Sequence, residues 1–212
     1  MPSRMADIIL KPGASDADIA LWLAQTLGAA LAATDGPIAI TIPGGSTPFP
    51  ILAALTDLGT PLDWSRIVVW PGDDRIVPED HPASNVGRIR AALEPLGAQV
   101  VALSEGATPP AFALAWLGMG GDGHIASLFP NTDPQVNAPA RVARLTPDPL
   151  PPEAPFDRLT MTIPQLVNSA AMVFVMRGAD KRAVFDAAAA GQSDLPIARL
   201  LGATGCPVTC FC

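Results

Sequence analysis

The chain has 212 residues, 49% of them hydrophobic and 16% charged, which suffices for one sizeable core and is too short for two substantial domains. Thirteen basic and twenty acidic residues give a net charge of −7, which argues against a nucleic-acid backbone or an anionic membrane surface as partner. No apolar run is long enough to cross a bilayer and the first eleven residues lack the apolar stretch of a secretory signal, so we expect one cytoplasmic domain over residues 1–212.

Apolar runs alternate with helical patterns along most of the chain. After a short apolar start at 8–10, Ser15 and Asp18 have the spacing of a capping box at a helix start. In chain order, the patterns predict a helix over 15–31, a strand over 38–42, a helix from 48, a strand over 67–70, a helix over 84–93, strands over 112–117 and 158–162, a helix over 164–170, a strand over 172–176, a helix over 180–190 and a strand over 208–211.

Short continuous apolar strands that alternate with helices are typical of an α/β fold. We therefore predict a single domain with a mainly parallel sheet covered by helices on both faces. The proline-rich stretch 146–153 is interpreted as a surface loop or hinge, because too little chain follows it to form an independent core. In such sheets, ligands bind beyond the carboxyl ends of the strands.

Gly44, Gly45, Ser46 and Thr47 follow the strand over 38–42 directly. Glycines at that place let the backbone approach a ligand, and free N–H groups before a helix face an anion, as phosphate binding requires. The segment matches neither the dinucleotide motif nor the P-loop motif. A tight turn with Thr47 as the cap of a helix that begins at Pro48 is the alternative interpretation.

Asp73, Asp74 and Arg75 follow the strand over 67–70. Arg75 at a strand end is able to clamp an oxyanion, although such triplets are more often ordinary exposed turns. His81, in the loop that leads to the next helix, is interpreted as a surface residue.

The segment Gly118-Met119-Gly120-Gly121-Asp122-Gly123-His124 closes the strand over 112–117. Its glycines keep other side chains away from one aspartate and one histidine, as a site needs where a ligand contacts the backbone and a catalytic group together. Histidine titrates near neutral pH and is suited to acid–base catalysis. A structural histidine is the alternative.

The three cysteines, Cys206, Cys210 and Cys212, lie within the last seven residues. An odd number crowded at one end is a poor disulfide framework, so we expect reduced thiols. The spacing also permits a metal site, but no histidine is near, and we predict none.

Taken together, these motifs resemble the 6-phosphogluconolactonases. The match continues through Ser127-Leu128-Phe129-Pro130, Arg158-Leu159-Thr160-Met161-Thr162-Ile163-Pro164 and Gly178-Ala179-Asp180-Lys181, and it covers about residues 35–211. The Asp-Gly-His segment followed by Ser-Leu-Phe-Pro is the most diagnostic part.

This resemblance implies hydrolysis of 6-phospho-D-glucono-1,5-lactone to 6-phosphogluconate, in the oxidative pentose phosphate pathway, without metal or organic cofactor. It implies that His124 moves the proton, that Asp122 orients the imidazole, and that the backbone between Gly120 and Gly123 stabilises the oxyanion. It places the substrate and its phosphate against Gly44, Gly45, Ser46, Thr47, Asp73, Arg75, Gly120, Gly123, Lys181 and, less directly, Arg158.

Two rival functions stay open at this point. Glucosamine-6-phosphate deaminases share the Asp-Gly-His element, but they follow it with a catalytic glutamate where this chain has Ser127 to Pro130. A non-catalytic sugar-phosphate sensor needs the phosphate contacts without His124, and little length remains for the partner-binding module it normally carries. The chain also departs from the lactonase pattern: Asp74 occupies the place of a usual glutamate, and the last strand stops early at Cys212.

Overall fold

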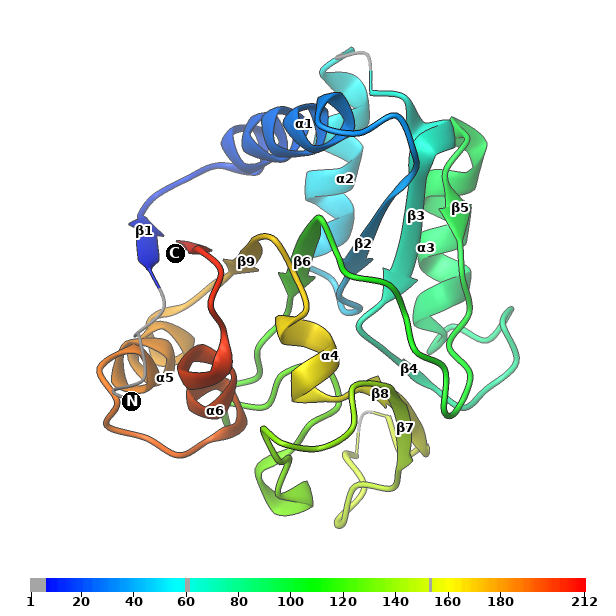
Figure 1. Ribbon diagram of the computed structural model, residues 1–212. Coiled ribbons are helices and arrows are strands. Elements are labelled where there is room, and N and C mark those ends of the chain that lie inside the picture. The colour runs from blue at the N-terminus through cyan, green and yellow to red at the C-terminus, as the bar shows by residue number, and fades with distance from the viewer. Residues whose placement is uncertain (1–6, 60–61, 153) are drawn as a thin grey trace.

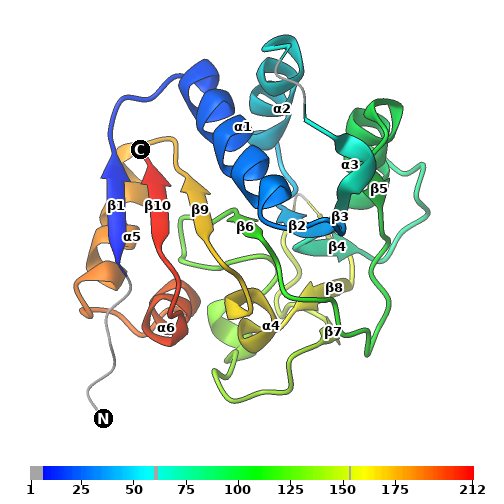
Figure 2. The same ribbon diagram turned by 45° about the horizontal axis from the view of Figure 1, so that its top comes forward.

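The computed structural model describes residues 7–59, 62–152 and 154–212, and within them a parallel sheet of seven strands forms the centre of the molecule (Figure 1). Its order is β1-β10-β9-β6-β2-β3-β5, and every neighbouring pair is parallel. Figure 2 shows β1, β10 and β9 side by side at one edge. The strands are β1 (Ile8–Lys11), β2 (Ile38–Ile42), β3 (Ile67–Pro71), β5 (Gln99–Val100), β6 (Leu114–Leu117), β9 (Met172–Val175) and β10 (Val208–Phe211).

Helices cover both faces of this sheet, as predicted. Alternate residues of a strand point to opposite faces, so Ile40 enters one core while its neighbour Ala39 enters the other. The first core holds α1 (Asp16–Ala32), α2 (Pro48–Asp57) and α3 (Asn85–Leu93); the second holds α4 (Ile163–Val167), α5 (Ala179–Ala189) and α6 (Pro196–Ala203). Short 3-10 turns lie at η1 (Trp64–Arg66), η2 (Glu94–Leu96) and η3 (Pro130–Thr132).

The helix ends test the predictions made from short sequence patterns. The predicted capping box at α1 is confirmed, because the Ser15 side chain accepts from the Asp18 N–H and the Asp18 carboxylate accepts from the Ser15 N–H. Thr47 and Pro48 take the predicted places as N-cap and first residue of α2, but the Thr47 side chain makes no capping hydrogen bond, and the Thr47 backbone is already helical (φ −63°, ψ −42°). The helix expected over 164–170 ends earlier, at Val167, and α6 is a helix that the sequence patterns did not predict.

A small antiparallel sheet packs beside the carboxyl ends of the main strands. It has the order β4-β8-β7, with β4 (Asp73–Arg75), β7 (Val142–Leu145) and β8 (Arg158–Met161). The strand predicted over 158–162 is confirmed as β8, although it belongs to this small antiparallel sheet. Of the two interpretations of 73–75, the exposed turn is wrong, because the segment is strand β4. Met161 N–H donates to Gly72 O, and Gly72 N–H donates to Ile42 O, so Gly72 joins the two sheets.

The chain order of the strands creates a switch point between β2 and β6. From β2 the chain proceeds outward through β3 and β5, and it then returns to the other side of β2 to form β6, β9 and β10. The segments that leave β2 and β6 therefore diverge and open a crevice at the carboxyl edge, where such folds bind ligands. In the part of the chain that the structure describes, no helix is both long and apolar enough to cross a membrane.

Candidate active site

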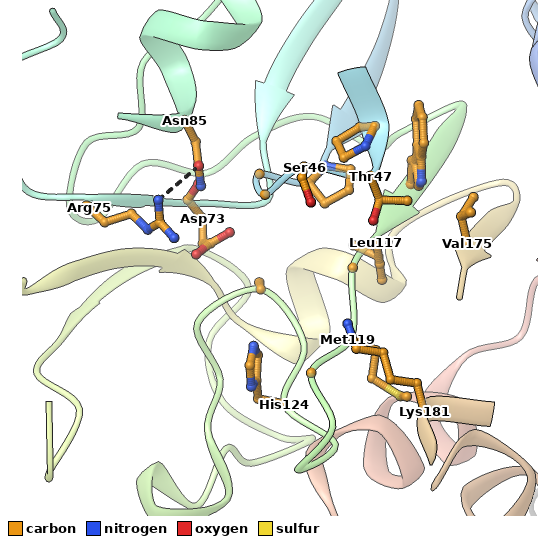
Figure 3. Close-up of a pocket in the computed structure, with 18 residues that line it drawn as sticks. Ser46, Thr47, Asp73, Arg75, Asn85, Leu117, Met119, His124, Val175 and Lys181 are labelled. Atoms are coloured by element: carbon orange, nitrogen blue, oxygen red, sulfur yellow. Dashed lines mark hydrogen bonds between the residues drawn. The ribbon is translucent and has the colours of Figure 1, made fainter. Parts of the chain in front are cut away.

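A cavity of about 300 Å³ occupies the crevice between β2 and β6. The segments after β2, β4 and β6 line it together with the first turn of α5, so it unites motifs that are far apart in the sequence (Figure 3). Of the predicted site residues, the lining contains Gly44, Gly45, Ser46, Thr47, Asp73, Arg75, Gly120, His124 and Lys181; Asp122, Gly123 and Arg158 lie outside it.

The turn after β2 presents backbone donors to this cavity. The N–H groups of residues 44–47 have no hydrogen-bond acceptor among the described residues. Gly45 has a φ of +84°, which favours glycine. A Cβ on Gly44 would lie 2.1 Å from Oδ1 of Asn85, so only a residue without a side chain fits against α3 there. Unpaired N–H groups at the start of α2 form a favourable place for an anion.

The strand β4 directs its three polar residues to two sides. Asp73 and Arg75 line the cavity, while Asp74 points to the N-terminus of α3. The Asp74 carboxylate accepts from the N–H groups of Asn85 (2.6 Å), Val86 (2.8 Å) and Arg75 (2.8 Å). Burial raises the pKa of Asp74, and these three hydrogen bonds oppose that rise. The shorter carboxylate at this position therefore caps α3 and fixes it beside the cavity.

Arg75 is held in place by groups on the loop before α3 and on α3 itself. Its Nη1 donates to the Ala83 carbonyl at 2.8 Å and lies 3.5 Å from Oδ1 of Asn85, and its buried Nε has no partner within the described residues. Asn85 also lines the cavity and donates from Nδ2 to the Asp73 carbonyl at 2.9 Å. Asn85 was not predicted as a site residue from the sequence.

His124 and Asp122 form a close pair at the opposite wall. Nδ1 of His124 lies 2.6 Å from Oδ1 of Asp122, and the imidazole packs on Phe129 with ring centroids 4.6 Å apart. With Nδ1 engaged, Nε2 is the ring nitrogen that is left to exchange a proton, and it has no hydrogen-bond partner among the described residues. Asp122 does not reach the cavity itself, so it acts on a ligand only through the imidazole.

The glycines around His124 shape the loop. A Cβ on Gly120 would lie 2.2 Å from Cε1 of His124, so the imidazole occupies the space that a side chain at 120 would fill. Gly123 has a φ of +78° and packs on Leu195, next to α6. The N–H groups of Gly120 and Gly123 donate to the carbonyls of His124 and Gly120 within the loop. The prediction that the backbone between Gly120 and Gly123 stabilises an oxyanion therefore falls on the N–H groups of Gly121 and Asp122, which have no acceptor among the described residues.

The cationic side chains differ in their placement. Lys181 lies in the first turn of α5 and extends its side chain into the cavity, as Figure 3 shows. Arg158 is buried in β8 instead, and its guanidinium donates to the carbonyls of Phe156 and Ala154 at 2.6 and 2.7 Å. Burial lowers the pKa of Arg158, and the charge of Arg75, its partner across the two strands, lowers it further. Its contacts give Arg158 the role of holding the chain before β8.

A second, more open hollow of about 470 Å³ adjoins the outer side of His124. Asp122, Phe129 and Asn131 line it together with prolines of the 146–152 segment. The proline-rich stretch thus lies beside the loop that carries His124, as the predicted surface loop, and its last predicted residue, 153, lies outside the described residues.

The fold and site define an α/β protein with a turn of N–H groups that have no acceptor among the described residues, and a His–Asp pair, at the switch point of its sheet. The family model of glucosamine-6-phosphate isomerases/6-phosphogluconolactonase matches residues 12–105 and 94–208, and the chain belongs to this family. It is 34% identical to a 6-phosphogluconolactonase of Pseudomonas putida over 87% of this chain and 84% of that protein. Another from Mesorhizobium japonicum is 32% identical over 83% and 82% of the two chains.

Solved structures agree with this assignment. The crystal structure of a 6-phosphogluconolactonase from Shewanella baltica matches with a TM-score of 0.79 and 25% identity, over 98% of this chain and 99% of the other. A putative 6-phosphogluconolactonase from Neisseria gonorrhoeae matches with a TM-score of 0.77 and 26% identity, over 96% and 97% of the two chains. The predicted single α/β fold and the resemblance drawn from the motifs are both confirmed.

Proposed function

We propose that this protein hydrolyses 6-phospho-D-glucono-1,5-lactone to 6-phosphogluconate, as the names of its relatives indicate. One observation carries the proposal: His124, which pairs with Asp122, lines the same cavity as four N–H groups at the start of a helix that have no acceptor among the described residues. This combination suits a substrate that has a phosphate at one end and a group that needs proton transfer at the other.

The phosphate is bound by the turn after β2. Its N–H groups, the first turn of α2 and the side chains of Arg75 and Lys181 offer donors and positive charge at this cavity. A protein with a net charge of −7 still binds a dianion there, because a local cluster of cations and backbone dipoles reverses the sign of the field. Arg158 does not take part, since its guanidinium is engaged by backbone carbonyls.

Nε2 of His124 accepts a proton from a water molecule as the water oxygen attacks C1 of the lactone. The same nitrogen returns the proton to the ring oxygen as the bond between that oxygen and C1 breaks, so the histidine is regenerated. Asp122 accepts a hydrogen bond from Nδ1–H, fixes the tautomer and stabilises the imidazolium that forms between the two transfers. No cofactor enters this sequence of steps.

The assay generates the δ-lactone in situ and follows its loss above the spontaneous rate, with glucosamine 6-phosphate as the comparison substrate. Wild type should accelerate lactone hydrolysis alone, because the segment from Ser127 to Pro130 offers no carboxylate where the deaminases have their catalytic glutamate. His124→Ala should lower kcat by about 10²- to 10⁴-fold and leave the fold intact. Unchanged turnover in that variant excludes His124 as the base, and binding without turnover by wild type indicates a sensor.

A further inference from the structure

Ser127 is a buried polar residue that the hydrolytic mechanism above does not use. It lies three residues after His124, its side chain is almost fully buried, and its Oγ donates to Oδ2 of Asp73 at 2.5 Å. Its own N–H donates to Oγ1 of Thr160, the residue paired with Asp73 across β4 and β8. Ser127 therefore joins the loop that carries His124 to the small sheet that carries Asp73.

Asp73 is constrained on two sides. Asn85 donates to its carbonyl and Ser127 to one carboxylate oxygen. The second oxygen, Oδ1, has no hydrogen-bond partner among the described residues, and Asp73 lines the cavity on the same side as Arg75 (Figure 3). An ionised carboxylate only accepts hydrogen bonds and repels another anion, so it suits hydroxyl groups and is a poor ligand for phosphate.

We propose that Ser127 is a positioning residue that holds Asp73 toward the cavity, and that Asp73 accepts hydrogen bonds from sugar hydroxyl groups instead of contacting the phosphate. The inference rests on the proposed function for the identity of the sugar. It divides the cavity into an anion-binding part, formed by the turn after β2 with Arg75 and Lys181, and a hydroxyl-binding part at Asp73. Because Ser127 and His124 share one loop, the position of the hydroxyl-binding carboxylate is tied to that of the base.

The test measures binding, so that it does not depend on catalysis. Glucitol 6-phosphate, a polyol phosphate, and hexyl phosphate, which has no hydroxyl group, are titrated calorimetrically into wild type, Ser127→Ala, Asp73→Ala and the double variant. Ser169→Ala is the matched control, because it removes one hydroxyl-to-carbonyl hydrogen bond of 2.6 Å outside the cavity. Wild type, the two single variants and the double variant form a double-mutant cycle. Thermal unfolding establishes that each variant is folded. If Asp73→Ala does not fold, Asp73→Asn replaces it in this cycle.

We expect Asp73→Ala to weaken glucitol 6-phosphate binding about 10- to 100-fold, the range of a hydrogen bond to a charged group. Ser127→Ala should weaken it less, and the double variant should equal Asp73→Ala, because Ser127 acts through Asp73. Hexyl phosphate should bind to each variant at least as tightly as it binds to wild type. The inference is overturned if the losses of binding free energy in Ser127→Ala and Asp73→Ala add up in the double variant. It is also overturned if the variants lose affinity equally for glucitol 6-phosphate and hexyl phosphate.

The same data separate this inference from the proposed function. If the double variant binds glucitol 6-phosphate as Asp73→Ala does, but wild type does not accelerate lactone hydrolysis, the result contradicts the function and supports the inference. If wild type accelerates lactone hydrolysis, but the losses of binding in the two single variants add up in the double variant, only the inference is contradicted.

Discussion

Gly120 gives the sharpest prediction, because its missing side chain makes room for the imidazole. A Cβ there would lie 2.2 Å from Cε1 and 2.3 Å from Nδ1 of His124, and 2.7 Å from Oδ1 of Asp122. Carbon atoms in contact normally stay about 3.5 Å apart, so Gly120→Ala must displace the ring by roughly 1 Å. Such a displacement at a catalytic group costs about 10²-fold in rate.

The displacement should affect catalysis and leave stability nearly unchanged. The His124 side chain is 31% exposed, so it has solvent to move into. Gly120 has no positive φ, so alanine is not strained in its backbone. We expect kcat to fall about 100-fold, with the free energy of unfolding changed by less than about 1 kcal/mol.

Gly121→Ala is the matched control. Its Cβ would meet nothing within 4 Å, and its φ is not positive, so its kinetics should be those of wild type. Steady-state lactone hydrolysis and urea unfolding of both variants decide the matter. Wild-type turnover in Gly120→Ala, or an equal loss in Gly121→Ala, would refute the steric argument.

Three further predictions concern charge and capping. Lys181→Ala should raise KM about tenfold or more at nearly constant kcat, because a phosphate contact shared by ground and transition states is uniform binding; a kcat loss alone contradicts this. Asp74→Ala should lower the free energy of unfolding by about 3 kcal/mol, measured in urea, since it leaves N–H groups of α3 unpaired. Ser15→Ala should cost about 1 kcal/mol. Hydrogen bonds from Ser15 lower the pKa of Asp18, so their stabilisation is complete above its ordinary pKa and is lost as pH falls through the lower folded value. The Ser15→Ala deficit should therefore shrink in acid.

The centre of the main sheet was predictable because its strands are buried on both faces. The runs 38–42 and 172–175 are wholly buried and, apart from Thr41, apolar, and few other structures accommodate such runs in a chain of this size. The short edge strand β5, with one exposed residue of its two, was not predicted. The capping box at Ser15 is likewise a local signal, since its donors and acceptors lie three residues apart. For these elements the physical cause lies within a short stretch of sequence.

The small sheet was not predictable in the same way. β4 consists of three charged residues, and it is a strand only because β8, far along the chain, pairs with it. The alternation that sends Asp73 to the cavity and Asp74 to α3 follows from this pairing. Arg158 shows the same limit: its motif suggested a ligand contact, whereas its burial in β8 directs it to backbone carbonyls.

The site itself was predicted better as a set than in its details. The three motifs at the strand ends do line one cavity, because parallel strands end at a common edge. Asn85 was missed, because its role depends on the packing of α3 against the turn after β2 and on the Asp73 carbonyl. The engagement of the Gly120 and Gly123 N–H groups was missed as well, because it depends on the loop conformation.

The switch point between β2 and β6 also has a consequence for folding. Gly44, Asp73, His124 and Lys181 come from both halves of the chain, and they meet only after β6 has docked beside β2 and β9 beside β6. Contacts of such large sequence separation form slowly, because closing long loops costs entropy before any packing compensates for it. We expect refolding chains to recover helical circular dichroism before they recover ligand binding, with the cavity assembled among the last steps.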